Sequence, residues 1–332
     1  MDIAIITSLY RAEAFLPGYI DALARVAAAI QAAGPRLEVI VIANDPTPAE
    51  DRLLADLTAR VDAASLRVER VPRETLYASW NRGVRLASGR ALGFWNVDDV
   101  RTADGLLEGL RRIDDGCDLV YFPWLLKTRW RWLGRFDVPH NVYQTALPYH
   151  PETFTAEMKA GPFFMFRRDF YAVNGPFDER FRVSGDFDWC VRATEHTTPC
   201  PGTSLAGSFN LHADNLSAEG KNYAENNIVF IKAGRYDRLF PSDPDTMRRL
   251  WSRWEDSLDL TPATAAALAE QMWGAGAADR WQAWQAERQR AVRQRARSET
   301  LRLLPRLLID YSGLRRALYR LGVVRSEHPH SR

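Results

Sequence analysis

The chain has 332 residues, of which 46% are hydrophobic, 26% charged and 11% aromatic. This is the composition of a globular protein, and it excludes the collagen-like, disordered and disulfide-scaffold classes. The formal net charge of +2 is too small to indicate a nucleic-acid partner, and we expect none. The length allows one large domain or two of modest size.

Hydropathy and cysteine content bear on the compartment. No stretch approaches the roughly 18 uncharged apolar residues of a membrane span, and residues 1–10 lack the pattern of a signal peptide. The three cysteines, Cys117, Cys190 and Cys200, include no Cys-x-x-Cys pair. We therefore expect three reduced thiols in a cytoplasmic protein that at most lies against the inner face of the membrane.

The first hundred residues alternate strand and helix patterns. Short apolar runs predict buried strands at 3–6, 39–42, 66–71 and 91–95. Amphipathic or capped segments predict helices at 11–33, 50–61 and 76–87. Such repeated units predict a mostly parallel sheet with helices on both faces. Ligands of these sheets bind beyond the carboxyl ends of the strands.

The middle of the chain, about residues 102–238, is less regular. Helices are expected near 102–114, 186–195 and 218–233, and strands near 119–123 and 208–212, with a further apolar run at 163–166. A long loop rich in Trp, Arg and Pro is expected from 124 to 151. The last ninety residues have helical patterns.

The C-terminal segment differs in charge from the rest. Residues 280–332 contain thirteen arginines and four acidic residues, so the remainder of the chain is net negative. Leu314, Leu318 and Leu321 recur at helical spacing among arginines. A basic amphipathic helix of this kind packs on the body of the protein, packs on a second subunit, or lies on an anionic membrane.

The first acidic motif, Asn96-Val97-Asp98-Asp99, directly follows the fourth predicted strand. Carboxylates at this position can hold a hard cation such as Mg²⁺ or Mn²⁺, and the cation can in turn hold a diphosphate. The alternative is a solvated turn whose acids cap the next helix.

The second acidic motif is Gly185-Asp186-Phe187-Asp188. A carboxylate at a helix start can act as a general base towards a substrate hydroxyl. Asp186 and Asp188 diverge on a helix, so only one of them can face a given ligand. The alternative is a pair of acids favoured by the helix dipole.

A basic and aromatic motif occupies residues 127–132, which read Lys-Thr-Arg-Trp-Arg-Trp. Aromatic faces stack on sugar rings, and arginines pair with phosphate or carboxylate. We expect an acceptor site or a lid here. A single-stranded nucleic-acid platform has similar composition, but the negative charge of the body argues against it.

Six motifs occur in an order and spacing that resemble one family over about residues 3–230. They are Thr7-Ser8-Leu9-Tyr10, the segment 42–47, the Asn81-x-Gly segment 81–89, Asn96-Val97-Asp98-Asp99, the segment 174–179 and the segment 185–192. Together they resemble the family 2 glycosyltransferases, which are inverting enzymes of the GT-A fold.

The resemblance implies a fold class and domain boundaries. The fold would be α/β of GT-A type, a Rossmann-like mixed and mostly parallel sheet flanked by helices, with a C-terminal helical extension. Residues 1–100 would form the nucleotide-sugar-binding half of the GT-A domain and residues 101–238 the acceptor-binding and catalytic half. Residues 239–332 would form the basic helical extension.

The resemblance also implies an activity and roles for residues. The enzyme would move a hexosyl group from a nucleotide-diphosphate sugar to a hydroxyl of a glycan or lipid-linked acceptor, in surface polysaccharide biosynthesis, with Asp186 as the base. Donor contacts are expected from Thr7, Leu9, Asn44, Asp45, Asn81, Asn96, Val97 and Asp98. Acceptor contacts are expected from Asp99, Trp130, Trp132 and Asp188. Mn²⁺ or Mg²⁺ would be held by Asp98 and His212.

Three positions depart from the family pattern. Asn44 and Asn96 stand where the family often has Asp, and Gly185 stands where it has an acid. Metal binding then falls on Asp98. One alternative is a nucleotidyltransferase, but the Gly-rich basic first loop that would favour this class is missing at residues 7–14. The other alternative is a non-catalytic glycan- or membrane-binding module, but the retention of Asp98, Asp99 and Asp186 argues against it.

Overall fold

The computed structural model describes residues 1–61, 66–132, 136–212, 215, 222–287, 290, 291 and 294, with the backbone alone for 129–132 and 136–140. These residues form two compact units. The larger contains residues 1–240 and 249–259, and the smaller contains residues 241–248 and the described residues from 260 onward.

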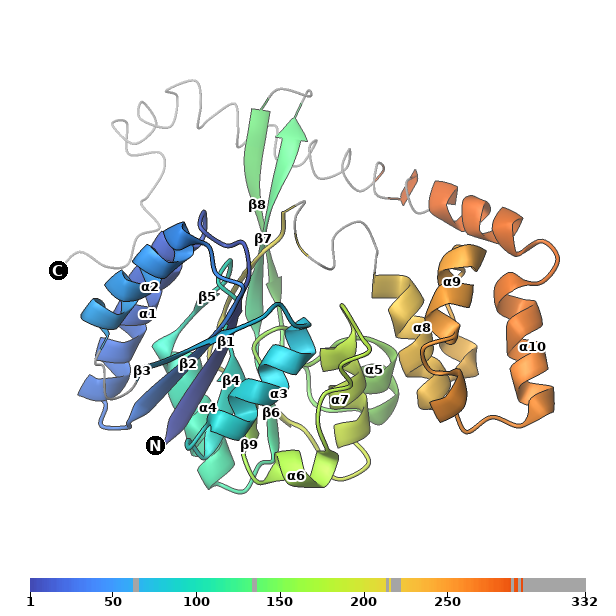
Figure 1. Cartoon of the computed structure of the whole chain (residues 1–332). Coiled ribbons are helices and arrows are strands. Elements are labelled where there is room, and N and C mark those ends of the chain that lie inside the picture. Colours follow the sequence, from blue (N-terminus) through green and yellow to red (C-terminus); the bar gives the residue numbers. More distant parts are fainter. Residues whose placement is uncertain are drawn as a thin grey trace, which may run out of the picture. The chain divides into compact units, whose positions relative to one another are not determined.

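Seven strands form the main sheet of the larger unit, in the order β10-β6-β9-β4-β1-β2-β3 (Figure 1). β9 is antiparallel to β4 and β6, and the other pairs are parallel. The mixed, mostly parallel sheet expected from the sequence is therefore confirmed. The strands are β1 (Ile3–Leu9), β2 (Leu37–Asn44), β3 (Leu66–Val71), β4 (Ala91–Phe94), β6 (Leu119–Tyr121), β9 (Met165–Arg167) and β10 (Cys200–Pro201).

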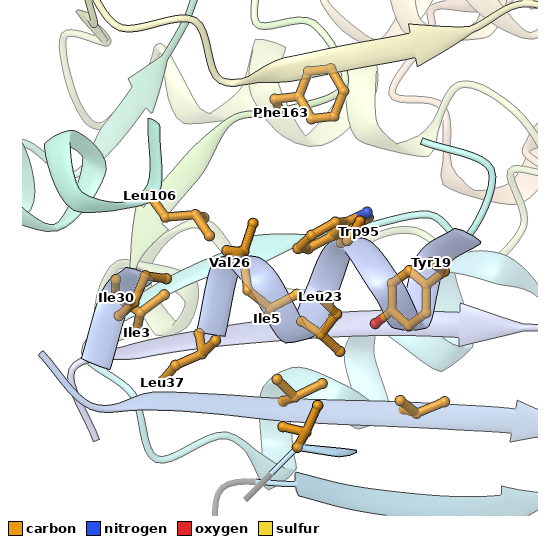
Figure 2. Packing of buried hydrophobic residues seen from close by; sticks show 14 of the residues in the cluster. Ile3, Ile5, Tyr19, Leu23, Val26, Ile30, Leu37, Trp95, Leu106 and Phe163 are labelled. Atoms are coloured by element: carbon orange, nitrogen blue, oxygen red, sulfur yellow. The ribbon is translucent and has the colours of Figure 1, made fainter. Parts of the chain in front are cut away.

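Helices cover both faces of this sheet, because the strands are apolar on both sides. Ile3 and Ile5 of β1 pack in one cluster with residues of α1 such as Leu23 (Figure 2). Ile6 points to the opposite face, where α3 approaches so closely that a Cβ on Gly83 would lie 2.3 Å from the Ile6 side chain. The helices of this part are α1 (Leu16–Ala32), α2 (Pro48–Arg60), α3 (Leu76–Leu86), α4 (Ala103–Asp114), α6 (Phe170–Asn174) and α7 (Gly185–Ala193).

The first helix starts later than predicted. It begins at Leu16, five residues after the expected Arg11. Arg11 has a φ of 50°, which is left-handed and cannot continue a right-handed helix. Residues 11–15 therefore form a turn at the carboxyl end of β1.

Four further strands form a second sheet, in the order β5-β11-β7-β8. They are β5 (Val100–Arg101), β11 (Gly207–Asn210), β7 (Trp124–Trp132) and β8 (Phe136–Gln144). The predicted loop from 124 to 151 is thus wrong for residues 124–132 and 136–144, because β7 and β8 pair as an antiparallel hairpin. Pro139 lies in β8, which is an edge strand, where a missing N–H is tolerated. The pairing of β5 with β11 brings residues 98–101 beside residues 207–212.

The remaining elements are helical. They are α5 (Pro151–Ala156), α8 (Asn222–Lys232), α9 (Pro244–Trp251), α10 (Pro262–Trp273) and two short 3₁₀ turns. Within the described ranges, no helix has the length and apolarity needed to cross a membrane. Leu314, Leu318 and Leu321 lie outside the described residues, and their helix stays a prediction.

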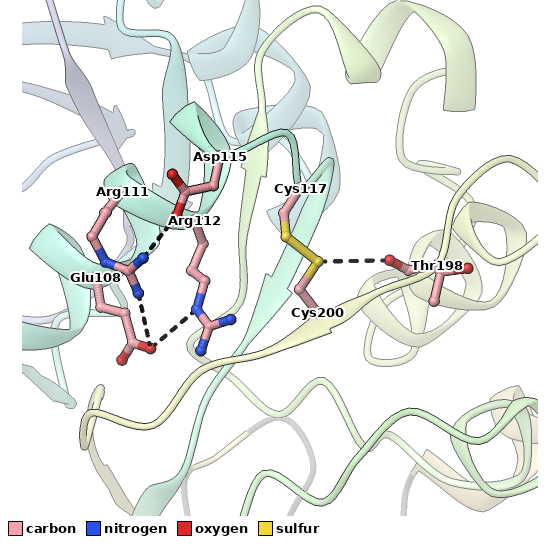
Figure 3. Close-up of a disulfide and its surroundings, with 7 residues drawn as sticks. All are labelled: Glu108, Arg111, Arg112, Asp115, Cys117, Thr198 and Cys200. Carbon is pink, nitrogen blue, oxygen red and sulfur yellow. Dashed lines mark hydrogen bonds and ion pairs between the residues drawn. A yellow bond between two sulfur atoms is a disulfide. The ribbon is translucent and has the colours of Figure 1, made fainter.

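The expectation of three reduced thiols is wrong for two of them. Cys117, which follows α4, forms a disulfide with Cys200 of the edge strand β10 (Figure 3). Cys190 is a buried free thiol. The two bonded residues are 83 positions apart in the sequence. Only the parallel pairing of β10 with β6 brings them together, so no local spacing could indicate the bond.

Reduction of this disulfide is expected to destabilise the protein. Closing a loop of this length restricts the unfolded chain, and native disulfides typically contribute about 2–4 kcal/mol. The Cys117→Ser/Cys200→Ser variant should lose that much free energy of unfolding in denaturant titrations, and dithiothreitol should not destabilise it further. Cys190→Ala is the control and should keep the full response to dithiothreitol. Equal midpoints for the wild type with and without reductant would contradict the bond.

Candidate active site

Two carboxylates predicted to carry chemistry lie at the same edge of the main sheet. β1 to β4 are parallel, so their carboxyl ends meet at one edge, and Asp98 follows β4. Glu74 follows β3 at this edge and donates its backbone N–H to Asn44 at the end of β2, at 3.1 Å. Three residues further on, in the first turn of α3, the Tyr77 hydroxyl lies 3.2 Å from Asp186 Oδ1. Asp98 and Asp186 are thus at one edge, although 88 positions separate them.

Asp98 is held in a turn between β4 and β5. The Asp99 N–H donates to the Asn96 carbonyl at 3.0 Å, and the Trp95 indole donates to the Asp99 carbonyl at 3.0 Å. Asp99 points inward, where its Oδ1 accepts the Asn210 N–H at 3.0 Å. Asp98 remains partly exposed beside its buried neighbour.

The Asp98 carboxylate meets the chain that follows β11. Its Oδ2 lies 3.0 Å from His212 Nε2 and 3.0 Å from Asn215 Nδ2. The His212 ring stacks on Phe15 with ring centres 5.1 Å apart, and the His212 N–H donates to Asn215 Oδ1 at 2.5 Å. The sequence analysis missed Asn215, because a single asparagine three residues after a histidine carries no signal of its own.

Asp98 and His212 have the chemistry of a divalent cation site. A carboxylate oxygen and an imidazole nitrogen converge to 3.0 Å, and both are ligands that Mn²⁺ accepts. In the described part of the chain no group of three or more His, Cys, Asp or Glu side chains could hold a metal ion. The phosphates of a bound substrate usually complete the coordination of a cation such as Mg²⁺.

Asp186 lies in the first turn of α7 and is partly exposed. Its Oδ1 accepts the Phe187 N–H at 2.9 Å and lies 3.2 Å from the Tyr77 hydroxyl. Burial raises the pKa of the Asp186 carboxyl to about 6, against the two hydrogen bonds, which lower it. A carboxylate with a raised pKa is better matched to proton abstraction near neutral pH.

Two of the predicted acceptor contacts are turned into the protein. Asp188 is 1% exposed, and its carboxylate forms ion pairs with Arg192 at 3.0 Å and Lys232 at 2.5 Å. Asp99 is also buried, and burial together with the neighbouring Asp98 raises its pKa well above the ordinary value. Neither carboxylate is exposed at the surface, and the predicted acceptor contacts of both residues stay a prediction.

The other two predicted acceptor residues are Trp130 and Trp132. Their backbone belongs to β7, where they pair with Val138 and Phe136 of β8. Their side chains lie outside the described part of the structure.

Four of the predicted donor residues are also buried, because they end strands or lie on the inner side of α3. Thr7 bonds to Tyr19 at 2.7 Å, and the Asn81 amide bonds to Phe177. Asn44 donates to Ser79 at 3.0 Å. The buried residues are Thr7, Leu9, Asn44 and Asn81. Their side chains shape the strand ends, and their contacts with a donor stay a prediction.

The exposed surface at this edge is formed by other residues. Of the predicted donor contacts, Asp45 is exposed, and Asn96 and Val97 are partly exposed. Beside them the guanidinium of Arg73 lies over the Tyr10 ring, 4.3 Å from its centre. The sequence analysis did not select Arg73, because it comes after the third strand in a segment without a motif.

Comparison with known proteins places the chain in a family. The model of "Glycosyl transferase family 2" matches residues 4–173, just over half of the chain. A "PGL/p-HBAD biosynthesis glycosyltransferase" of Mycobacterium bovis (strain BCG / Pasteur 1173P2) is 28% identical over 193 residues, which are 57% of this chain and 68% of that protein. A protein of the same name from Mycobacterium tuberculosis (strain ATCC 25177 / H37Ra) matches equally well.

Solved structures share the fold. The structure of S. aureus TarS 1-349 in complex with UDP-GlcNAc has a TM-score of 0.54 at 14% identity, covering 83% of this chain and 79% of that one. The mannosyltransferase PcManGT from Pyrobaculum calidifontis, in complex with GDP-Man and Mn²⁺, has a TM-score of 0.51 at 15% identity, covering 80% and 78%. At these identities the likeness concerns the fold alone.

Proposed function

Since this chain belongs to glycosyl transferase family 2 and is a glycosyltransferase of GT-A fold, we propose that it transfers a hexosyl group, with inversion, from a nucleotide-diphosphate sugar to a hydroxyl of a glycan or glycolipid. The observation that carries the proposal is that the partly exposed carboxylates of Asp98 and Asp186 occur at one edge of the sheet. Asp98 lies beside the His212 imidazole, which can bind a cation together with it. Asp186 has a raised pKa, which suits a general base.

The donor would lie across the carboxyl ends of β1 to β4. Tyr10 and Arg73 offer an aromatic ring and a positive charge there, with Asp45, Asn96 and Val97 beside them. An aromatic face suits a nucleobase, and a guanidinium suits a phosphate. The bound UDP-GlcNAc and GDP-Man named for the TarS and PcManGT structures support a nucleotide sugar as donor.

Asp98 and His212 would hold a divalent cation, Mn²⁺ or Mg²⁺, with Asn215 orienting the carboxylate. When bound, such a cation offsets the charge that develops on the departing diphosphate. The Mn²⁺ named for the PcManGT structure supports this assignment.

Asp186 would act as the base. As the acceptor oxygen attacks the anomeric carbon, its proton passes to the Asp186 carboxylate, and the bond from that carbon to the donor phosphate oxygen breaks. Attack from the face opposite the leaving group inverts the configuration in one displacement. No covalent sugar–enzyme intermediate is then needed, by the logic that separates the two classes of glycosidase.

The acceptor and the pathway are proposed from a relative. The curated mycobacterial relatives are named for PGL/p-HBAD biosynthesis, which supports a role in assembly of a surface glycolipid or polysaccharide. A lipid-linked acceptor would also suit the basic C-terminal segment, which carries thirteen arginines and could lie against an anionic membrane.

A screen of thermal stability tests the donor class. UDP-, GDP- and dTDP-sugars are each added with Mn²⁺, with Mg²⁺ or with EDTA, and release of the free nucleotide is measured in parallel. A ligand at about 100 times its Kd stabilises the native state by about 2.7 kcal/mol, which for a protein of this size raises Tm by roughly 5–10 °C. We expect one nucleotide class to produce this rise, and only with a cation. No rise and no nucleotide release with any donor would contradict the proposal.

A further inference from the structure

We propose that Tyr77 is a positioning residue for the base, holding Asp186 through its Oδ1 so that Oδ2 is presented to the acceptor hydroxyl. This inference rests on the proposed role of Asp186. It concerns a residue of α3 that matches none of the motifs, and whose hydroxyl meets α7 more than a hundred positions later in the chain.

The hydrogen bonds of Asp186 are one-sided. Oδ1 accepts from the Phe187 N–H at 2.9 Å and contacts the Tyr77 hydroxyl at 3.2 Å. No hydrogen bond to Oδ2 occurs within the described part of the chain. One oxygen is therefore anchored, and the other is available to a substrate on a partly exposed side chain.

The Tyr77 hydroxyl is itself fixed. It shares its one proton between the Val183 carbonyl at 2.7 Å, just ahead of α7, and Asp186 Oδ1 at 3.2 Å, so it ties both the base and the segment before it to α3. Burial raises the pKa of Tyr77 well above its ordinary value, so the hydroxyl stays protonated and can donate throughout the working pH range. The ring packs edge-on to Trp80 at 5.4 Å between centres.

Gly185 provides the space for this ring. A Cβ built on Gly185 would lie 2.7 Å from two carbons of the Tyr77 ring, closer than real contacts allow. The departure from the family pattern at 185, where an acid is usual, is thereby explained. Loss of the side chain next to the base makes room for a tyrosine that reaches the base from another helix.

The segment before Asp186 is held from a third element. Glu225 of α8 is buried, and its carboxylate accepts three consecutive backbone N–H groups, those of Arg182, Val183 and Ser184, at 2.7–3.1 Å. The titratable groups that face Asp186 within the described chain are Tyr77 from α3, Glu225 from α8 and Cys190 of α7. With this backbone fixed, the remaining freedom is the side-chain rotation of Asp186, which Tyr77 restricts.

Tyr77→Phe tests the proposal, because it keeps the ring and removes only the hydroxyl. For the wild type, kcat/KM should rise with pH through the pKa of about 6, since the base must be ionised. Without the hydroxyl the ionised form loses a hydrogen bond, so this limb should move to higher pH by about half to one unit. We expect kcat to fall about tenfold, with the KM for the donor unchanged.

Gly185→Ala provides an independent variant that keeps the hydroxyl but displaces the ring. It should shift the acid limb in the same direction, and the Gly185→Ala/Tyr77→Phe double variant should shift it no further than the larger single effect. Tyr121→Phe is the matched control. It removes a hydroxyl that bonds a backbone carbonyl, that of Leu147 at 2.5 Å, and should leave the pH profile unchanged.

The outcomes separate this inference from the proposed function. An unchanged kcat and acid limb in Tyr77→Phe, with Asp186→Asn inactive, overturns the positioning role alone. An active Asp186→Asn overturns the base assignment and the positioning role with it. An equal shift in Tyr121→Phe shows that loss of any such hydroxyl perturbs the enzyme, and also overturns the role of Tyr77. If Tyr77→Phe does not fold, the position of the acid limb of the pH profile in Gly185→Ala decides whether Tyr77 positions the base.

Discussion

Replacing Asp186 by Asn should lower kcat by about 10²–10⁴-fold, the usual contribution of a general base, while leaving donor binding nearly intact. The amide cannot accept the acceptor's proton near neutral pH, yet it preserves the size of the side chain and can still accept from the Phe187 N–H, which now bonds Oδ1. Transfer is measured with the donor found in the thermal screen, and donor affinity by the rise in Tm.

A matched control is available for this substitution. Asp169→Asn makes the same chemical change on an exposed carboxylate in front of α6 and should retain wild-type rates. Full activity of Asp186→Asn would show that another group takes the proton. Loss of donor affinity in step with loss of turnover would indicate that Asp186 is needed for the structure of the site.

Replacing Asp98 by Ala should abolish the stabilisation that depends on the cation. The variant loses the carboxylate that faces His212 and Asn215, so Mn²⁺ should no longer raise Tm in the presence of the donor. Transfer should fall at least about a hundredfold, because charge on the leaving diphosphate is no longer offset. Wild-type enzyme in EDTA should behave in the same way.

Two further measurements locate the effect. His212→Ala should also weaken the cation response, while Asp104→Ala, at an exposed acid in the first turn of α4, should leave it unchanged. A wild-type Mn²⁺ response in Asp98→Ala would place the cation elsewhere. A response lost in Asp104→Ala as well would mean that general destabilisation, and not a ligand, explains the result.

The sequence predicted the sheet better than the site. Strands such as β1 begin with a continuous apolar run, here residues 3–6, and the burial of both faces of the strand follows from that pattern. The hairpin of β7 and β8 was missed, because Pro139 and the polar residues around it are compatible with a strand only at a sheet edge. The bond between Cys117 and Cys200 was missed because it depends on which strands become neighbours.

Motif positions were recognised without knowledge of where each side chain points. Asp98 and Asp99 are adjacent in one motif, yet Asp98 is partly exposed and meets His212, whereas Asp99 is buried and accepts the Asn210 N–H. Asp186 and Asp188 were expected to diverge on a helix, and the structure shows Asp188 in ion pairs with Arg192 and Lys232. Asn44 was assigned to the donor, but its amide bonds to Ser79.

What the sequence determined by itself is the order of strands and helices over residues 3–95, the family, and the positions of the acids Asp98 and Asp186. These follow from local pattern and motif order, which are properties of neighbouring residues. Only the tertiary structure decided which groups accompany those acids, namely Asn215 beside Asp98 and Tyr77 beside Asp186. The physical reason is that a hydrogen bond between segments a hundred residues apart depends on how the sheet and helices pack, and leaves no periodic trace in the chain.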